Sequence, residues 1–400
     1  MTRSQMVRQV RHDLNVKPFI AIWEVTRACQ LVCRHCRADA QHEPAPGQLS
    51  TEEGFALLDS LATYDHPRPL VVLTGGDPFE RGDLTELTRY GTGLGLNISL
   101  SPSVTPRLTR ARLVELREAG GSALSLSLDG AVAETHDHFR GFAGTFKQTV
   151  EMARVVTDFG YRLQINSTLT AGNVHQAPAL LARVIDMGAR LWSVFFLVPT
   201  GRGAGLGALD ADEREDVLHW LHDVSDRVAI KTTEAPQYRR VVLQRTQGQS
   251  YQGGELYRYL TDATTRLLGE RPTTPRRPRP PMAVNAGSGF VFIDHLGDVY
   301  PNGFLPLHCG NVRDTPLPEI YSDSPVFRSL RDPSTWRGKC SVCEFASVCG
   351  GSRSTAYAIT GDPLASDPTC SHVPAAWTPD EGDRREERGH RALRISAPGS

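Results

Sequence analysis

The chain lacks any long apolar run. No stretch approaches the roughly 20 apolar residues that a membrane-spanning helix needs, and the N-terminal sequence MTRSQMVRQVRHDLNVKPF contains no apolar signal core. A surplus of one charge is also missing, since 44 lysines and arginines stand against 45 acidic residues. Because nucleic-acid binding relies on a basic surplus, the sequence predicts neither a membrane nor a nucleic-acid partner, and it favours a cytoplasmic location.

Cysteine is absent from the middle of the chain, between Cys36 and Cys309. In a reducing cytosol, cysteines gathered near the two ends of a chain indicate metal ligands before disulfides. The length of 400 residues favours one large domain with a smaller one appended. The eight cysteines are Cys29, Cys33, Cys36, Cys309, Cys340, Cys343, Cys349 and Cys370.

Short apolar runs alternate with longer amphipathic stretches from about residue 18 to residue 200. The runs predict strands at 19–24, 70–73, 97–100, 123–128, 162–166 and 191–198. The stretches between them predict helices at 51–62, 83–90, 110–119, 144–159 and 176–187. Because each crossover can hold a helix, the strands should be parallel. The expected fold class is α/β, a partial (β/α)6 barrel with a small cysteine-rich C-terminal auxiliary-cluster domain.

The composition divides the chain into five regions. After a helix expected at 211–228 the pattern becomes less regular, and RPTTPRRPRPP at 271–281 predicts an exposed loop or linker. Residues 289–293 and 298–300 flank a turn and predict a hairpin. The regions are an N-terminal arm at 1–17, the barrel at 18–230, a connecting region at 231–285, the cysteine-rich domain at 286–378 and a disordered tail at 379–400.

The first cysteine group, C-x3-C-x2-C, follows the first predicted strand directly. Cys29, Cys33 and Cys36 offer three thiolates on one short loop. They can ligate three irons of a 4Fe-4S cube, which leaves the fourth iron without a protein ligand. Zinc is the alternative, because His35 lies within the motif and a Cys-and-His zinc site takes four protein ligands.

The segment WEVTRACQLVCRHCR at 23–37 resembles the signature loop of the radical S-adenosylmethionine (SAM) superfamily. The resemblance implies a SAM-binding 4Fe-4S cluster on Cys29, Cys33 and Cys36, with SAM chelating the open iron. It also implies reductive cleavage of SAM to a 5'-deoxyadenosyl radical, which abstracts hydrogen from a substrate carbon. A low-potential donor such as a flavodoxin or ferredoxin would supply the electron.

The segment TGGDP at 74–78 follows the second predicted strand and resembles the family's GGEP segment, with Asp in place of Glu. Glycines let the backbone approach a ligand closely. The resemblance therefore implies SAM contacts from Gly75, Gly76, Asp77 and Pro78.

Polar residues also follow the later strands, where active sites of barrel folds gather. Ser127 and Asp129 are candidates for contacts to the SAM ribose or to substrate, and a cap on the next helix is the alternative. Asn166 and Thr168 resemble SAM contacts at the end of the fifth strand. Arg202, in a segment that resembles PxGRG, is a candidate partner for a carboxylate of SAM or substrate. A solvated loop arginine is the alternative.

The second cysteine group is spaced C-x2-C-x5-C-x20-C, at Cys340, Cys343, Cys349 and Cys370. Four thiolates can ligate a further cube completely, and zinc is the alternative. The segment resembles the SPASM extension, whose complete form carries two auxiliary clusters. Here Pro301, Asn302 and Arg353 replace expected cysteines, so the resemblance implies one auxiliary 4Fe-4S cluster. Cys309 is left over and is expected to be a small buried thiol.

The substrate is indicated by resemblance alone. The runs at 300–313 and 349–353, with the reduced cysteine set, resemble radical SAM enzymes of alternative heme and heme d1 synthesis. That resemblance implies a tetrapyrrole that loses carboxyl groups from its propionates. Maturases of ribosomal peptides, including the mycofactocin type, and natural-product decarboxylases, epimerases and dehydrogenases share the same skeleton and stay open. So does a non-catalytic iron–sulfur or zinc scaffold, although a scaffold has no use for an open iron.

Overall fold

The computed structural model describes residues 6–270, 272 and 274–378. Its centre is one ten-stranded sheet in the order β10-β9-β8-β1-β2-β3-β4-β5-β6-β7. From β1 to β7 each strand pairs in parallel with the next, and β8 pairs in parallel with the other edge of β1. The strands are β1 Ile20–Glu24, β2 Leu70–Thr74, β3 Asn97–Leu100, β4 Ala123–Ser127, β5 Arg162–Leu169, β6 Leu191–Phe196, β7 Ile230–Thr233, β8 Phe290–Ile293, β9 Asp298–Tyr300 and β10 Gly310–Asn311.

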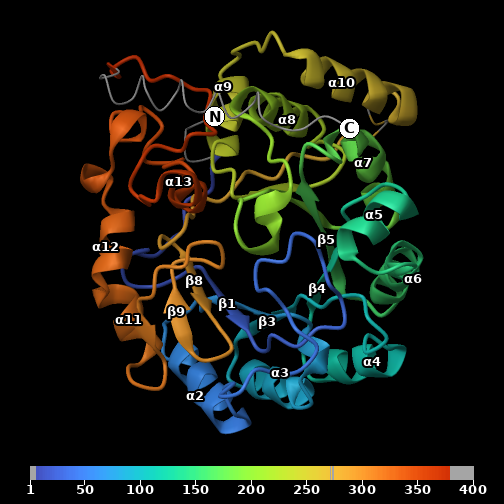
Figure 1. The fold of residues 1–400 in the computed structure, drawn as a ribbon, viewed down its shortest axis with the longest axis vertical. Coiled ribbons are helices and arrows are strands. Elements are labelled where there is room, and N and C mark those ends of the chain that lie inside the picture. The colour runs from blue at the N-terminus through green and yellow to red at the C-terminus, as the bar shows by residue number, and fades with distance from the viewer. Residues whose placement is uncertain (1–5, 271, 273, 379–400) are drawn as a thin grey trace.

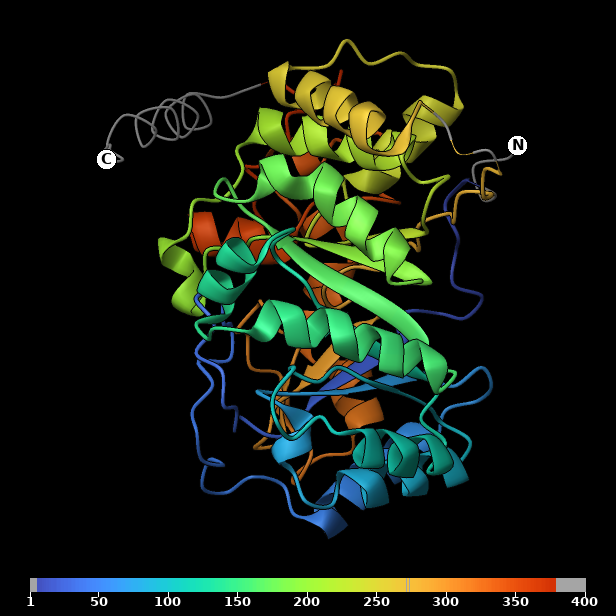
Figure 2. The ribbon, with the colours of Figure 1, turned by 90° about the vertical axis from the view of Figure 1, so that its right-hand side faces the viewer.

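The helices surround the curved sheet on its outer side (Figures 1 and 2). The first of them starts at a capping box, in which Ser50 and Glu53 satisfy each other's backbone N–H groups. The helices are α2 Thr51–Ala62, α3 Leu84–Gly93, α4 Arg110–Glu118, α5 Ala133–Arg140, α6 Thr145–Asp158, α7 Ala177–Asp186, α8 Ala211–Asp223, α9 Tyr238–Thr246, α10 Glu255–Leu268, α11 Leu317–Asp323, α12 Pro325–Arg331 and α13 Arg353–Thr360.

Strand β5 illustrates how the sheet separates its two faces. Leu163 and Ile165 are buried in the core beneath the helices. The intervening Gln164, Asn166 and Thr168 are half-buried and line cavities inside the barrel. Because side chains alternate along a strand, these three polar side chains of β5 face the barrel interior, where a ligand can reach them.

The α/β barrel class is confirmed, and the sheet extends beyond the six predicted strands. β7 has the sequence IKTT, so no apolar run marks it. The expectation of an irregular segment after residue 228 is wrong, because α9 and α10 lie there and α10 contacts α7 and α8. The five region boundaries stay predictions, and the predicted tail at 379–400 lies outside the described residues.

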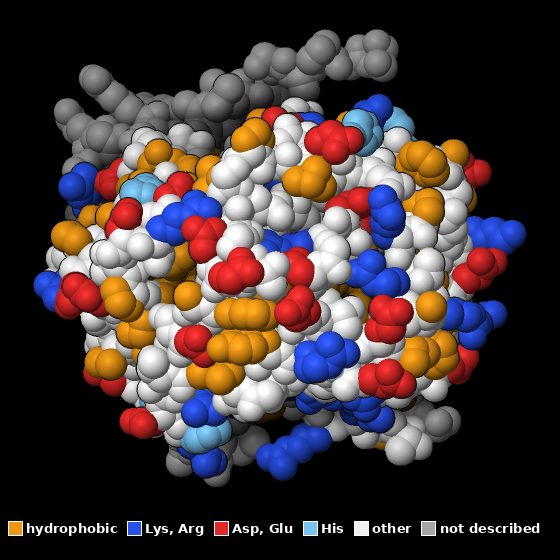
Figure 3. Space-filling view, turned by 90° about the horizontal axis from the view of Figure 1, so that it is seen from below, with side chains coloured by type: hydrophobic (Ala, Val, Ile, Leu, Met, Phe, Trp, Pro, Cys, Tyr) orange, Lys and Arg blue, Asp and Glu red, His pale blue; other side chains and the backbone are white. Residues whose placement is uncertain are grey.

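The predicted hairpin is confirmed as β8 and β9, with Phe292 opposite Tyr300. Because β8 also pairs with β1, the C-terminal domain continues the barrel sheet. Within the described part of the chain, none of the helices combines the length and apolar content that a bilayer crossing requires. Acidic and basic side chains are interspersed over the face seen from below (Figure 3).

Candidate active site

The three cysteines of the first group lie on the loop that follows β1. The Cys29 N–H donates to the Gln41 carbonyl at 2.8 Å, and the Cys36 N–H donates to the Cys33 carbonyl at 3.2 Å. The Arg34 N–H donates to a carbonyl at the end of α5 at 2.9 Å. All three thiols are free and line one cavity at the carboxyl ends of the strands. The loop therefore presents three sulfur donors to one space.

The glycines after β2 are required by contact with this cysteine loop. A Cβ atom on Gly75 would lie 2.4 Å from the Thr26 carbonyl oxygen, and one on Gly76 would lie 2.4 Å from the Ala28 carbonyl oxygen. The Gly76 N–H donates to the Thr26 carbonyl at 2.8 Å. Both glycines also line the cavity. Their lack of side chains thus locks two loops together beside the space where a ligand would bind.

Asp77 and Pro78 lie behind the cavity lining. The Asp77 carboxylate accepts hydrogen bonds from the Phe79 N–H at 3.1 Å, the Ser103 N–H at 3.3 Å and the Thr105 hydroxyl at 2.7 Å. Burial raises the pKa of Asp77 to about 6. Pro78 is buried and begins a short 3-10 helix. In this structure both residues support the loop that contains Gly75 and Gly76, here called the glycine loop, on the side away from the cavity.

Ser103 joins the cysteine loop to the glycine loop. Its hydroxyl lies 3.7 Å from the Cys29 sulfur and donates to the Gly76 carbonyl at 3.0 Å. Ser103 is not among the site residues that the sequence predicts. The sequence does contain an indication of it, because Ser101 and Ser103 follow the third strand just as the predicted polar site residues follow the fourth and fifth strands.

Arg140 brings a buried positive charge to the cysteine loop. Its guanidinium forms an ion pair with Asp129 and lies 3.8 Å from the Cys33 sulfur. Asp129 also accepts a hydrogen bond from the Thr168 N–H at 2.8 Å. Burial alone would raise the pKa of Asp129, but the Arg140 charge holds it below its usual range. The carboxylate is therefore ionised and oriented before any ligand arrives.

The remaining predicted contacts on β4 and β5 come together at the cavity. Ser127, Asn166 and Thr168 all line it, and the Gln164 amide donates to the Asn166 side-chain oxygen at 2.7 Å. Among the described residues, the Ser127 and Thr168 hydroxyls have no hydrogen-bond partner. Both hydroxyls are thus free to bind a ligand.

Arg202 packs against the backbone of the cysteine loop. Its Nε donates to the Cys33 carbonyl at 3.0 Å, and its own N–H donates to the Cys36 carbonyl at 3.2 Å. It also forms an ion pair with Asp39 at 3.3 Å. In this structure Arg202 holds the cysteine loop from outside the cavity lining, with its side chain 27% exposed, and its pairing with a carboxylate of SAM or substrate stays a prediction.

The donor set fits an iron–sulfur cluster. Burial raises the pKa of the Cys29 thiol to about 11 and also raises that of Cys33. Thiolates are the form that binds metal, so the charge of bound iron is needed to deprotonate these thiols. Arg140 supplies further positive charge next to the Cys33 sulfur.

The second cysteine group surrounds a smaller cavity, lined by all four of its thiols. The Phe345 N–H points to the Cys343 sulfur at 3.4 Å, and the Gly351 N–H points to the Cys349 sulfur at 3.5 Å. Gly350 and Gly351 have positive φ angles of 72° and 67°, which favour glycine. Hydrogen bonds to sulfur are a regular feature of iron–sulfur sites, so this cage also fits a cluster.

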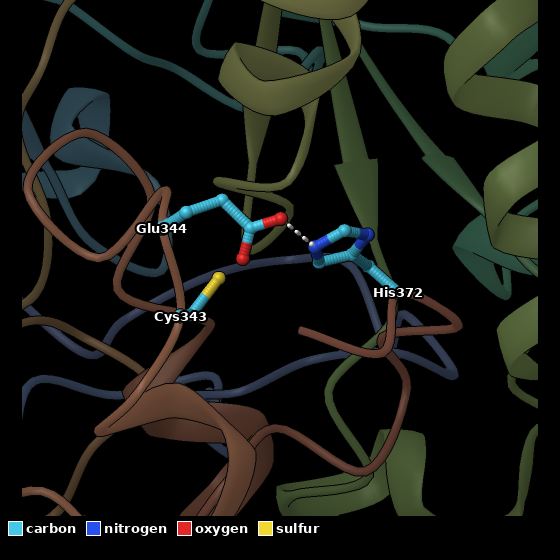
Figure 4. A group of neighbouring side chains, drawn as sticks. All are labelled: Cys343, Glu344 and His372. Carbon is cyan, nitrogen blue, oxygen red and sulfur yellow. Dashed lines mark hydrogen bonds and ion pairs between the residues drawn. The ribbon is translucent and has the colours of Figure 1, made fainter. Parts of the chain in front are cut away.

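A mixed set of donors lies at the rim of this cage (Figure 4). Donor atoms of Cys343, Glu344 and His372 lie within 4.8 Å of one another, and the His372 Nε2 lies 3.0 Å from a Glu344 carboxylate oxygen. This set is the part of the site that suits a single metal ion such as zinc. It shares Cys343 with the four-cysteine cage, so the two sites cannot both be filled.

Packed polar side chains occupy the positions where cysteines of a complete SPASM extension would stand. The Asn302 amide donates to Glu234 and to the Ser354 hydroxyl, both at 2.9 Å. Arg353 is 1% exposed and donates to backbone carbonyls. Cys309 is half-buried, and its thiol donates to the Leu307 carbonyl. The four clustered cysteines therefore account for one auxiliary cluster.

Comparison with known proteins identifies the class of this chain. The radical SAM superfamily profile matches residues 23–177, and the SPASM iron–sulfur cluster-binding domain profile matches residues 285–344. The crystal structure of Streptococcus suis SuiB bound to SAM shares the fold, with a TM-score of 0.64 at 15% identity, and the match covers 89% of this chain and 78% of that one. The chain belongs to the radical SAM superfamily and carries a SPASM domain.

Its particular sequence is similar to heme synthases over most of its length. The AdoMet-dependent heme synthase of Oleidesulfovibrio alaskensis is 42% identical over 357 residues, which cover 88% of this chain and 87% of that protein. The enzyme of the same name from Nitratidesulfovibrio vulgaris is 41% identical over 364 residues, 89% and 93% of the two chains. This chain is an enzyme that uses SAM and a 4Fe-4S cluster, and its SPASM domain adds auxiliary iron–sulfur chemistry.

Proposed function

We propose that the enzyme oxidatively decarboxylates propionate side chains of a tetrapyrrole. The observation that carries this proposal is the similarity to two AdoMet-dependent heme synthases at 42% and 41% identity. The cavity at the barrel mouth supports it, because charged and polar side chains are already oriented beside three thiols.

The proposed roles follow the contacts. Cys29, Cys33 and Cys36 would hold the cluster that supplies an electron to SAM. The backbone at Gly75 and Gly76 and the free hydroxyls of Ser127 and Thr168 would hold SAM, together with Asp129 and Asn166. Asp77, Pro78 and Arg202 would position the loops that contact SAM.

The chemistry balances with one SAM for each propionate. One electron cleaves SAM to methionine and a 5'-deoxyadenosyl radical. The radical takes one hydrogen atom from the ring-side carbon of R–CH2–CH2–COO⁻, and the substrate then loses CO2 and one electron to become R–CH=CH2. The reaction needs a one-electron donor and a one-electron acceptor, the kind of chemistry that iron–sulfur centres supply. We propose a flavodoxin or ferredoxin as the external donor.

A deuterium experiment tests this function. The anaerobically reconstituted enzyme receives SAM, dithionite and iron coproporphyrin III deuterated at the ring-side propionate carbons. We expect vinyl products by mass spectrometry and deuterium in 5'-deoxyadenosine. The Cys29→Ser variant should give neither. If 5'-deoxyadenosine forms without label and no vinyl product appears, the substrate is wrong, and a precursor peptide encoded beside the gene becomes the next candidate.

A further inference from the structure

A second large cavity lies at the opposite end of the barrel. It is lined by the first residues of several strands, including Ile20, Leu70 and Leu191. Phe195 and Phe304 line both this lower cavity and the upper cavity that contains the three cysteines. The two cavities therefore adjoin at these two residues.

Three cationic side chains from distant parts of the chain enter the lower cavity. Arg8 comes from the N-terminal arm, Lys231 from the inner face of β7, and Arg279 from the proline-rich segment. Among the described residues, none of the three has a carboxylate partner, although the Arg8 Nε donates to the Pro280 carbonyl at 3.0 Å. A fourth cation, Arg239, donates its hydrogen bonds to backbone carbonyls.

The cations are close enough to affect one another. Burial lowers the pKa of Lys231 to about 8, and the charge of Arg279 contributes to this shift. Burial also lowers the pKa of Arg279, to which the charge of Arg8 adds. Glu234 is the one acid among the described lining residues, and its carboxylate oxygens accept hydrogen bonds from Asn302 and Ser352.

A charge that is partly removed from water is stabilised when an opposite charge meets it. Here the half-buried Arg8 and Lys231 and the exposed Arg279 face an otherwise largely apolar cavity, with no carboxylate partner among the described residues. We infer that the lower cavity binds a planar apolar polycarboxylate, the tetrapyrrole of the proposed function, with Arg8, Lys231 and Arg279 pairing with its carboxylates. The substrate body lies against the apolar walls, and the reacting propionate extends past Phe195 and Phe304 toward the upper cavity. This inference rests on the proposed function.

The segment predicted to be an exposed linker is exposed at 274–279, and its last three residues, 279–281, line this cavity. The Arg8 N–H donates to the Pro281 carbonyl at 2.8 Å, and the Ala283 N–H donates to the Arg8 carbonyl at 2.9 Å. Its prolines have fixed φ angles, so the wall is stiff. The N-terminal arm and the proline-rich segment together place two of the three cations.

Binding without turnover tests the inference. Iron coproporphyrin III, which carries a propionate on each ring, is titrated into the reconstituted enzyme without reductant, and the shift of its Soret band gives Kd. Lys231→Met and Arg279→Met keep most of the side-chain volume and remove the charge. Since hydrogen bonds to charged groups contribute most when buried, each variant should bind roughly 10- to 100-fold more weakly.

The matched control is Arg277→Met, in the same segment but outside the cavity lining, and it should bind like the parent. The methyl ester of the same tetrapyrrole should bind parent and variants alike. The melting temperature of Lys231→Met should be no lower than that of the parent, because the variant loses an unpaired charge. If parent and both cavity variants bind the acid equally, the inference is overturned while the proposed function stands. If the parent itself does not bind, both are overturned.

Discussion

The buried ion pair between Asp129 and Arg140 permits the sharpest test of how the upper cavity is built. Asp129 is 1% exposed and accepts a hydrogen bond from the Thr168 N–H at 2.8 Å in addition to its ion pair. Asp129→Asn keeps the size of the side chain and removes its charge. Arg140 would then be a buried cation beside the Cys33 sulfur, with no carboxylate to balance it.

Breaking a buried pair from one side costs about 3–5 kcal/mol. In a barrel of this size 1 kcal/mol corresponds to roughly 2–4 °C in melting temperature. Asp129→Asn should therefore lower the melting temperature by about 6 °C or more. The matched control is Asp323→Asn, because the Asp323 and Arg328 side chains are 60% and 63% exposed. Exposed pairs contribute about 0–1 kcal/mol.

Thermal unfolding of the iron-free chains, followed by circular dichroism at pH 7, provides the comparison. If Asp129→Asn yields no soluble protein, the double variant with Arg140→Met decides the question. Removing both charges leaves no unpaired ion, so the double variant should be more stable than Asp129→Asn alone. Equal melting temperatures for Asp129→Asn and Asp323→Asn would refute the view that this pair holds the cavity together.

Two further predictions concern the cysteine sites. Gly76→Ala should lower iron incorporation and SAM cleavage, because the new Cβ would lie 2.4 Å from a carbonyl oxygen of the cysteine loop. The control Gly82→Ala should behave like the parent, because a Cβ at Gly82 would have no neighbouring atom within 4 Å. Cys349→Ser should lower the iron content of reconstituted enzyme from about eight to about four per chain, since one of two cubes is lost. Cys309→Ser should retain the full iron content of the parent. Equal iron loss in Cys349→Ser and Cys309→Ser would contradict a single auxiliary cluster held by the four clustered cysteines.

The sequence predicts the first six strands because each is a short apolar run between turn residues. It does not reveal β7, whose IKTT sequence faces a cavity on one side and therefore lacks an apolar pattern. The three-cysteine motif predicts where the sulfurs gather, because a short loop leaves them little freedom. It does not predict that Asp77 points away from the cavity or that Arg202 binds the loop backbone. These directions depend on loops that meet only after the barrel has closed.

The two cavities differ in how their charges are balanced. In the upper cavity Arg140 is paired with Asp129, and outside it Arg202 is paired with Asp39, so the shape of the cysteine loop needs no substrate. In the lower cavity Lys231 and Arg279 lack a carboxylate partner among the described residues, and in our inference the ligand supplies it. The proposed substrate, a tetrapyrrole with several propionates, would relieve that imbalance. A propionate that turns toward the upper cavity for a second decarboxylation would leave one cation unpaired, so the doubly decarboxylated product would bind more weakly than the substrate.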